Sequence, residues 1–250
     1  MDAILLCVPD RSIAQVARRL ARSLKARPLV AHCSGALDLS PLEPLATQGC
    51  GVGSLHPLQA VPSPHERLFG FAAIDAPRPK DASLLAKVAR SAGLQPLGLP
   101  GAPRALYHAT AALASNGLVA LQEQSAELLE RCGAPKRLAR EAVTRLMVSA
   151  LGRDLTGPVA RGDASVVAAH LQALRRSAPD VLPLYRALAT TQVGLARELG
   201  QATAGQLRAI LEVLKAPGTG PSPGRRRAPR AGPAPRRPAR GRASRGSRSS

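Results

Sequence analysis

The hydrophobic periodicity of the chain changes once, near Pro103, and this change constrains the fold more than any other feature. Before Pro103, short apolar runs alternate with segments that have helical spacing. After it, every apolar segment has helical spacing. Strands that alternate with helices are typical of a parallel or mostly parallel sheet with helices on its faces. The sequence therefore predicts an α/β domain followed by an all-α domain.

The short apolar runs predict five strands, and the apolar residues spaced three and four apart predict helices. The first helix follows Pro9, and either Asp10 or Ser12 can cap it. Asp163 can cap a later helix in the same way. The predicted strands are residues 3–8, 29–33, 52–57, 69–76 and 94–99, and the predicted helices are 12–24, 80–92, 104–131, 136–151, 163–176, 180–199 and 203–214.

Composition divides the chain into three parts. We expect an α/β domain over residues 1–101, an all-helical domain over 102–215 and a basic tail over 216–250. The tail holds ten of the arginines, seven prolines and six glycines, and has no apolar periodicity, so we expect it to be disordered. Without it the net charge of +19 falls to +9. The tail is either a weak electrostatic arm for nucleic acid or a solvated extension, and it has no aromatic residue for base stacking.

The cysteines and the apolar runs bear on location and on metal binding. The four cysteines show neither C-x-x-C spacing nor a histidine at metal-ligand spacing, so no zinc site and no disulfide framework is predicted. We expect reduced, mostly buried thiols. No apolar run approaches the roughly 18 residues of a membrane helix, and we expect a cytoplasmic protein.

A sheet of this type followed by helices suggests a dinucleotide-dependent enzyme, but the usual glycine fingerprint is not found. In such enzymes the first strand leads into G-x-G-x-x-G, where the backbone approaches the pyrophosphate. The nearest approximation, GCGVGS at 49–54, opens a strand instead of following one. Because its position relative to the strand is wrong, this match is weak evidence for nucleotide binding.

Three segments resemble a known family in order and in content. They are VAHCSGALDLSPLEPLATQGCGVGSLHPLQAVP (30–62), YHATAALASNGLVAL (107–121) and LTGPVARGDASVVAAHLQAL (155–174). Together they resemble bacterial Rossmann-like proteins that carry a C-terminal domain of unknown function. That family is similar to pyrroline-5-carboxylate reductases and to 6-phosphogluconate and 3-hydroxyacid dehydrogenases. The resemblance covers roughly residues 2–200.

The resemblance also implies an N-terminal truncation. Members of the family begin with a strand, a glycine-rich turn and further β-α units before the segment that matches DAILLCVPD at residues 2–10. Residues 1–101 would then be a partial Rossmann-like nucleotide-binding domain that lacks the first β-α units. Either the start codon lies further upstream or the protein is a shortened relative. We expect NADP or NAD to be the cofactor, with binding and activity impaired in this form.

The resemblance implies that the cofactor lies at the carboxyl ends of the strands. Val8, Pro9 and Asp10 would lie beside the ribose, and Ser34 and Gly35 nearer the nicotinamide. The same residues also have local interpretations, since Pro9 ends a strand, Asp10 can cap a helix and Ser34 with Gly35 turns the chain.

His56 and Pro57, with Gln59, would line the same cleft. A histidine at the end of a strand can meet a ligand and exchange protons near neutral pH. A buried, hydrogen-bonded structural histidine is the alternative.

The helix after Pro103 supplies the candidate catalytic residues. His108 and Ser115 are seven residues apart and lie nearly above one another on an α-helix, with Asn116 to one side. In related dehydrogenases a lysine and an asparagine on this helix serve as acid/base and substrate anchor. No lysine occurs here, so His108 and Asn116 are the catalytic candidates and Ser115 a substrate contact. Alternatively, this is a small-residue packing helix.

The string LTGPVARGD supplies two further candidates for substrate binding. Thr156 lies in a predicted helix interruption, and Arg161 offers a bidentate grip for a carboxylate or phosphate.

The hypothesis is an NAD(P)-dependent oxidoreductase of the Rossmann-like family that reduces a small carbonyl or imine compound. It predicts an upstream in-frame extension that encodes a glycine-rich turn. The alternative is a non-catalytic binding or dimerisation protein on the same scaffold, and nucleic-acid binding through the tail is a third. The resemblance implies a homodimer through the helical domain, and neither a metal nor a membrane partner is expected.

Overall fold

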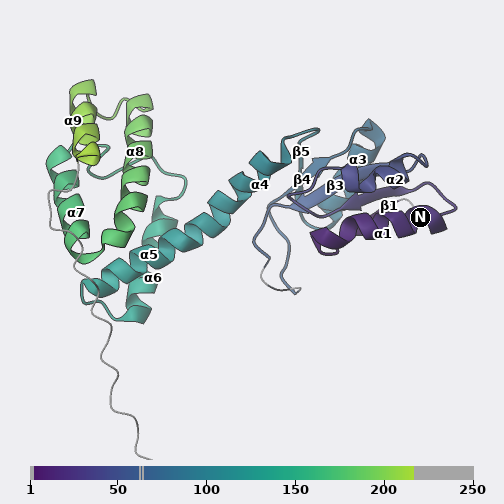
Figure 1. Ribbon diagram of the computed structural model, residues 1–250, viewed down its shortest axis with the longest axis horizontal. Coiled ribbons are helices and arrows are strands. Elements are labelled where there is room, and N and C mark those ends of the chain that lie inside the picture. The colour runs from purple at the N-terminus through teal and green to yellow at the C-terminus, as the bar shows by residue number, and fades with distance from the viewer. Residues whose placement is uncertain (1–2, 62, 64, 217–250) are drawn as a thin grey trace, which may run out of the picture. The chain divides into compact units, whose positions relative to one another are not determined.

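The computed structural model of the 250-residue chain describes residues 3–61, 63 and 65–216. Its contacts divide the chain into an N-terminal unit, Met1–Asp154, and a C-terminal unit, Leu155–Ser250 (Figure 1). The predicted disorder of the basic tail concerns residues outside the described ranges from position 217 onward. The domain boundaries predicted at 101 and 215 remain predictions.

The N-terminal unit begins with α/β structure. Its strands are β1(Ala3–Leu6), β2(Leu29–His32), β3(Gly51–Pro57), β4(Phe71–Asp75) and β5(Gln95–Gly98). Its first helices are α1(Asp10–Ser23), the 3₁₀ turn η1(Ser40–Leu42), α2(Glu43–Ala46) and α3(Pro79–Ser91). The sequence had not predicted η1 and α2, which together are only two short turns in a proline-punctuated stretch.

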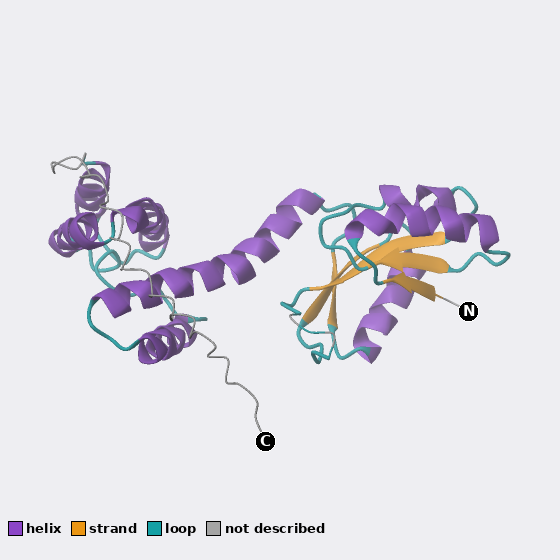
Figure 2. Ribbon diagram, turned by 60° about the horizontal axis from the view of Figure 1, so that its bottom comes forward, coloured by secondary structure: helices purple, strands orange, loops and turns teal. Residues whose placement is uncertain are grey.

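Within the described residues the five strands form one sheet in the order β1-β2-β3-β4-β5. All neighbouring pairs are parallel except β3 and β4, which are antiparallel. A loop joins these two strands, whereas a parallel pair needs a longer crossover, usually a helix. The prediction of a mostly parallel sheet with helices on its faces is confirmed (Figure 2).

Burial in β2 shows why the sheet has two covered faces. All four residues of β2 are buried, and they alternate between two cores. Leu29 and Ala31 belong to the core beneath α3, and Val30 belongs to the core beneath α1 and α2. A strand buried on both faces accounts for the continuous apolar run in its sequence.

The N-terminal unit continues into helices α4(Arg104–Ala112), α5(Leu118–Arg131) and α6(Lys136–Ala150). Between α4 and α5 lies a π-helical segment, η2(Leu113–Gly117), so the helix predicted over 104–131 is continuous but not regular. The C-terminal unit contains α7(Ala164–Ser177), the 3₁₀ turn η3(Pro179–Val181), α8(Leu182–Glu198) and α9(Ala204–Lys215). A capping box between Thr203 and Gln206 begins α9. The prediction of a helical second part is confirmed.

Three local predictions need correction. Pro9 and not Asp10 or Ser12 is the N-cap of α1, and no side chain caps this helix, because the Asp10 carboxylate accepts a hydrogen bond from Ser34 instead. Asp163 does occupy the N-cap position of α7, but its carboxylate accepts a hydrogen bond from the Ser165 hydroxyl and not from the backbone.

The third correction concerns the cysteines. Cys7 and Cys132 are exposed, Cys33 is half-buried, and Cys50 is buried. The thiols are therefore not mostly buried, because Cys7 and Cys33 follow strand ends and Cys132 ends a surface helix. In the described part of the chain, no helix has the length and apolar character that crossing a membrane requires.

Candidate functional site

The carboxyl ends of β1, β2 and β3 bring together the residues predicted to bind a cofactor. The register pairs Leu6 with His32, and His32 with Ser54. The residues that follow these positions therefore lie at the same end of the sheet, the carboxyl end of β1, β2 and β3. This end carries Val8, Pro9, Asp10, Ser34, Gly35, His56 and Pro57.

A hydrogen bond joins the first two of these segments. The Ser34 hydroxyl donates to Oδ2 of Asp10 at 2.8 Å. The same hydroxyl oxygen accepts the backbone N–H groups of Ala36 and Leu37, at 3.2 and 3.1 Å. Ser34 is buried and Asp10 is exposed, so the serine holds an accessible carboxylate in place.

His32 is a structural residue at this end of the sheet. Its ring is fully buried, its Nδ1 accepts the backbone N–H of Ser34 at 3.2 Å, and its Nε2 lies 2.9 Å from the carbonyl of Asp38. Because Nδ1 accepts, Nε2 carries the proton and donates to that carbonyl. Burial is the largest cause that lowers the pKa of His32, which keeps the ring neutral.

His56 connects the strand ends with helix α4. A Cβ atom on Gly35 would lie 2.8 Å from Cε1 and Nε2 of His56, so the imidazole packs directly against this glycine. On its other side, Nδ1 of His56 lies 2.6 Å from the hydroxyl of Tyr107, and the two rings meet edge to face at 88°. A larger side chain at position 35 would have to displace the ring.

The His56–Tyr107 pair is neutral. Burial lowers the pKa of His56, electrostatic interactions with His108 and Arg104 lower it further, and Asp10 raises it. Burial raises the pKa of Tyr107. Either the tyrosine hydroxyl donates to Nδ1, which leaves Nε2–H free, or Nδ1–H donates to the tyrosine oxygen, which leaves the hydroxyl hydrogen free. In both arrangements the pair keeps one polar hydrogen for another acceptor.

A buried arginine fixes the start of α4 against the sheet. Nη2 of Arg104 donates to Oγ of Ser54 and lies 3.4 Å from Oδ2 of Asp75. The other carboxylate oxygen of Asp75 accepts the backbone N–H of Gly101 at 3.1 Å. The Arg104 guanidinium also lies 5.8 Å from the ring centroid of Tyr107. These contacts place the first turn of α4, and with it Tyr107 and His108, beside the strand ends.

A cavity of about 600 Å³ opens at this point within the N-terminal unit. Its described lining carries no Asp, Glu, Lys or Arg. The polar residues are His56, Gln59, Tyr107, His108, Thr110, Ser115 and Asn116, and the larger apolar residues are Leu58, Leu97 and Leu99. The structure therefore brings the three candidates from the long helix, His108, Ser115 and Asn116, to one cavity together with His56.

The π-helical segment η2 contains Ser115 and Asn116. The expected superposition of His108 and Ser115 assumed a regular α-helix, and the wider π turn between them changes that phase. The Ser115 hydroxyl donates to the carbonyl of Ala111 at 2.8 Å. Bonds of this kind satisfy part of the backbone where the regular ladder is interrupted.

Thr156 and Arg161 lie in the C-terminal unit, in the turn that precedes α7. Both are exposed. Gly157 and Gly162 in this turn have positive φ angles of 93° and 72°, and a Cβ on Gly162 would lie 2.7 Å from the Gln206 side chain. The glycines of this string thus shape a tight turn that presents Arg161 to solvent.

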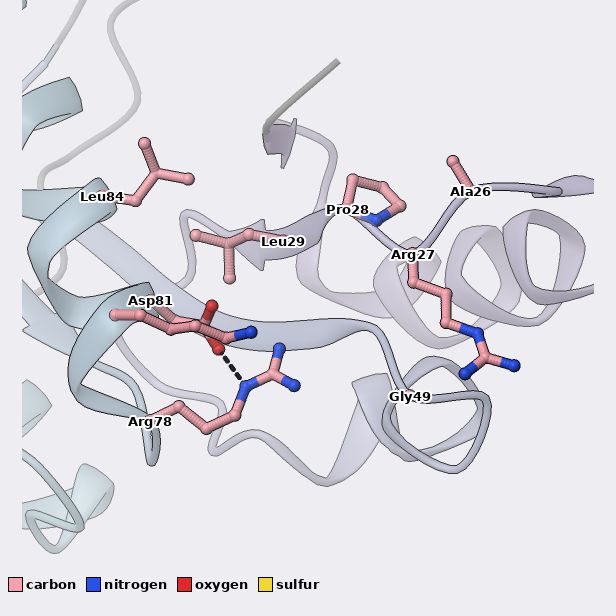
Figure 3. Close-up of a pocket in the computed structure, with 9 residues that line it drawn as sticks. Ala26, Arg27, Pro28, Leu29, Gly49, Arg78, Asp81 and Leu84 are labelled. Atoms are coloured by element: carbon pink, nitrogen blue, oxygen red, sulfur yellow. Dashed lines mark hydrogen bonds and ion pairs between the residues drawn. The ribbon is translucent and has the colours of Figure 1, made fainter.

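A second hollow, of about 490 Å³, lies at the opposite ends of β2 and β3 (Figure 3). Arg27, Arg78 and Lys80 line it, and Nε of Arg78 lies 2.5 Å from Oδ2 of the buried Asp81. A Cβ on Gly51 would come within 2.5 Å of Arg78, so the ion pair packs against the start of β3. This hollow is basic. It lies at the amino ends of β2 and β3, whereas the cofactor candidates lie at the carboxyl ends of the strands.

Sequence reasoning missed three groups of the site: Tyr107, Arg104 and Asp75. Tyr107 directly precedes His108 in the quoted motif, so its position was available as a signal. A buried Arg–Asp pair 29 residues apart offers no such signal, because it depends on the packing of α4 against β4. In the described ranges, no group of three or more His, Cys, Asp or Glu side chains is arranged to hold a metal ion.

The fold and the strand-end geometry define a Rossmann-like α/β protein with helices after the sheet. Residues 1–57 match the family model of the Rossmann-like domain, and residues 71–192 match that of a domain of unknown function, DUF2520. The first part of the chain therefore resembles the Rossmann-like domain, and residues 71–192 resemble DUF2520. No curated protein matches the sequence.

Solved structures share this fold at low identity. Protein TM1727 of Thermotoga maritima has a TM-score of 0.62 and 21% identity over 79% of each chain. A proposed NADP oxidoreductase of Bacteroides fragilis has a TM-score of 0.56 and 18% identity over 76% of this chain and 74% of that one. The pyrroline carboxylate reductase of Plasmodium falciparum with NADP bound has a TM-score of 0.51 and 12% identity over 84% and 77%. At these identities the likeness shows the fold.

Proposed function

We propose that this protein is an NAD(P)-dependent oxidoreductase that reduces a small carbonyl or imine compound in the cavity between β3 and α4. The observation that carries the proposal is the His56–Tyr107 pair, which lines the cavity and packs against Gly35. The likeness to an NADP-bound reductase and to a proposed NADP oxidoreductase supports the choice of cofactor class.

The residues at the ends of β1 and β2 fit the ribose of a dinucleotide. Asp10 is exposed, and among the described residues its second carboxylate oxygen, Oδ1, accepts no hydrogen bond. A free carboxylate oxygen is the acceptor that a ribose hydroxyl requires. Val8 and Pro9, also exposed, would offer the apolar surface beside it, with Ser34 and Gly35 toward the nicotinamide.

The nicotinamide would supply a hydride to the substrate carbon, and the chain would supply the proton. A proton donor must lie within hydrogen-bond reach of the substrate oxygen or nitrogen. The free polar hydrogen of the His56–Tyr107 pair and the His108 imidazole are the donors in the cavity, and Asn116 with Ser115 would hold the substrate. In the C-terminal unit, taken by itself, Arg161 with Thr156 would bind a carboxylate or phosphate. The uncharged lining of the cavity favours a substrate whose reacting end is neutral.

Nucleotide binding is the first test. NADPH and NADH would be titrated calorimetrically against the 250-residue chain and against a form extended by any in-frame upstream codons. We expect at least one form of the protein to bind either NADPH or NADH. The Asp10→Ala variant of that form should bind the nucleotide more weakly. The absence of binding by both forms would overturn the proposal.

Chemistry is the second test. Small carbonyl and imine compounds would be screened for oxidation of NADPH, and the pH profile of any active compound compared with that of Tyr107→Phe and His108→Asn. We expect a loss of about 100-fold or more from removal of the true proton donor. Thr110→Val, a change in the same cavity lining, is the matched control and should retain most of the activity.

A homodimer belongs to the same proposal. Large apolar side chains are exposed along α4 to α6, among them Leu106 at 69%, Leu113 at 75% and Leu146 at 68%. Such a concentration favours contact with another protein surface. The non-catalytic alternative, a dimerisation protein on the same scaffold, would keep this contact and bind no nucleotide.

A further inference from the structure

Cys7 and Cys33 lie side by side although they are 26 residues apart in the sequence. The parallel register of β1 and β2 pairs Leu6 with His32, so the next position pairs Cys7 with Cys33. The backbone N–H of Cys33 donates to the carbonyl of Leu6 at 3.4 Å, which continues the ladder. Their Sγ atoms are 3.5 Å apart.

This arrangement meets the geometric conditions for a disulfide. Neighbouring strands lie roughly 4.8 Å apart, which is within the range of about 4.4–6.8 Å that Cα atoms span across disulfides. Side chains at paired positions of neighbouring strands point to the same face, so both sulfurs are on one side of the sheet. Bond formation needs a sulfur approach of about 1.5 Å, which side-chain rotation at the strand ends can supply.

The two thiols differ in access. Cys7 is exposed and Cys33 is half-buried. Burial, followed by the neighbouring Cys7 sulfur, raises the pKa of Cys33 to about 12. The exposed Cys7 is therefore the sulfur that meets an oxidant first. A Cys7 thiolate opposes ionisation of Cys33 by its negative charge. Once Cys7 is oxidised to an uncharged sulfenic acid, this opposition is removed.

We propose that Cys7 and Cys33 form a reversible thiol–disulfide site that hydroperoxides oxidise. The Cys7 thiol releases its proton to water, and the thiolate attacks the peroxide. The O–O bond breaks, the Cys7 sulfenic acid forms, and the leaving alkoxide or hydroxide takes up a proton from water to become an alcohol or water. Cys33 then attacks the sulfenic sulfur, an S–S bond forms, and water leaves with the Cys33 proton. The two thiols together lose two electrons, which the peroxide gains, and a dithiol reductant reverses the reaction.

The site lies directly before the two segments that a hydrogen bond already joins. Cys7 precedes Val8-Pro9-Asp10, and Cys33 precedes Ser34-Gly35. A disulfide would add a covalent link beside the Asp10–Ser34 contact. The backbone of residues 8–10 and 34–37 would then open less often, whether or not the protein binds a nucleotide.

The experiment treats the reduced 250-residue protein with equimolar hydrogen peroxide and counts free thiols. We expect two of the four thiols to be lost, a mass decrease of two hydrogen atoms, and full recovery with dithiothreitol. Trypsin should release residues 1–11 linked to residues 26–67. Since the second peptide holds both Cys33 and Cys50, its fragmentation spectrum assigns the linked sulfur. Hydrogen exchange at residues 8–10 and 34–37 should slow in the oxidised form.

Matched variants decide the outcome. Cys7→Ser and Cys33→Ser should each abolish the linked peptide, and Cys132→Ser, which removes another exposed thiol, should leave it unchanged. Circular dichroism would establish that the variants fold. Four free thiols after treatment, a link from Cys7 to Cys50 or Cys132, or the same thiol loss in Cys7→Ser would overturn the proposal.

Discussion

At the scale of single residues, the site depends on buried side chains, and burial controls whether they carry a charge. His32 and His56 end neighbouring strands, and burial is the largest cause that lowers the pKa of each below 6.5. His32 is held by the backbone on both ring nitrogens, whereas His56 faces Tyr107 and the cavity. The imidazole of His32 therefore supports the carboxyl end of the sheet, and that of His56 is available for chemistry.

These histidines predict that the fold loses stability in mild acid. The unfolded chain binds protons near pH 6.5, while the folded chain keeps both rings neutral until the pH is lower. The free energy of unfolding should be full above pH 6.5 and fall as the pH drops below it. Urea titrations at pH 7.5 and 5.5 would measure the loss, and His56→Gln should reduce it.

His65→Asn is the control because this histidine lies exposed in the loop before β4. It should leave the pH dependence as in the unaltered protein. An unfolding free energy that is equal at the two pH values would contradict the prediction.

The Arg104–Asp75 pair predicts a large cost for loss of one partner. Both side chains are buried, with 7% and 6% of their residue surface exposed. Asp75→Asn would leave the guanidinium without its counter-charge, and should lower the free energy of unfolding by about 3 kcal/mol. Chemical denaturation measures the change.

Arg145 offers the matched surface pair. Its guanidinium lies 3.0 Å from Glu141 on α6, and its side chain is 79% exposed. Arg145→Met should change the free energy of unfolding by about 0.5 kcal/mol or less. Equal effects of the two substitutions would show that the buried pair does not secure α4.

At the scale of elements, the periodicity of the sequence predicted the strands and helices, and packing decided their details. The π-helical segment η2 was missed because the residues of 104–131 keep a helical pattern on both sides of it. One wide turn shifts Ser115 and Asn116 relative to His108 without interrupting that pattern. The cap of α1 was wrong for a similar reason, since the partner of Asp10 is Ser34 from another strand end.

Glycine at the start of β3 predicts an element-scale effect. A Cβ at Gly51 would lie 2.5 Å from Nη2 of Arg78 and 2.8 Å from Oδ1 of Asp81. Gly51→Ala must displace this ion pair, and should lower the free energy of unfolding by about 1–3 kcal/mol. Thermal and urea unfolding measure the change.

Gly194, inside α8, is the control for this substitution. Among the described residues, no atom outside its local helix lies within 4 Å of the position that a Cβ methyl group would take there, and its φ is not positive. Gly194→Ala should therefore raise the free energy of unfolding by about 1 kcal/mol. A destabilising Gly194→Ala, or a neutral Gly51→Ala, would contradict the packing argument.

At the scale of the whole molecule, the exposed leucines of α4 to α6 predict self-association. Leu113 on η2 and Leu146 on α6 are 75% and 68% exposed. Burial of such side chains stabilises an interface by roughly 1.5–3 kcal/mol each. Light scattering after size exclusion should give the mass of a dimer, and Leu113→Asp with Leu146→Asp should give the mass of a monomer.

The control is Leu199→Asp at the end of α8, a residue that is 47% exposed in the C-terminal unit. It should leave the mass unchanged. A monomer at micromolar concentration in the unaltered protein would sink the prediction, and it would leave nucleotide binding to be decided separately.

The sequence by itself determined the elements and the class of fold, because helix and strand periods are local properties of the chain. It also placed candidate residues at strand ends and on one helix. Only the tertiary structure decided which of them meet: Asp10 with Ser34, His56 with Tyr107, and Cys7 with Cys33. These contacts depend on the register of β1 with β2 and on the packing of α4 against the sheet. Sequence spacing carries no information about either, since each contact joins segments 24 to 51 residues apart.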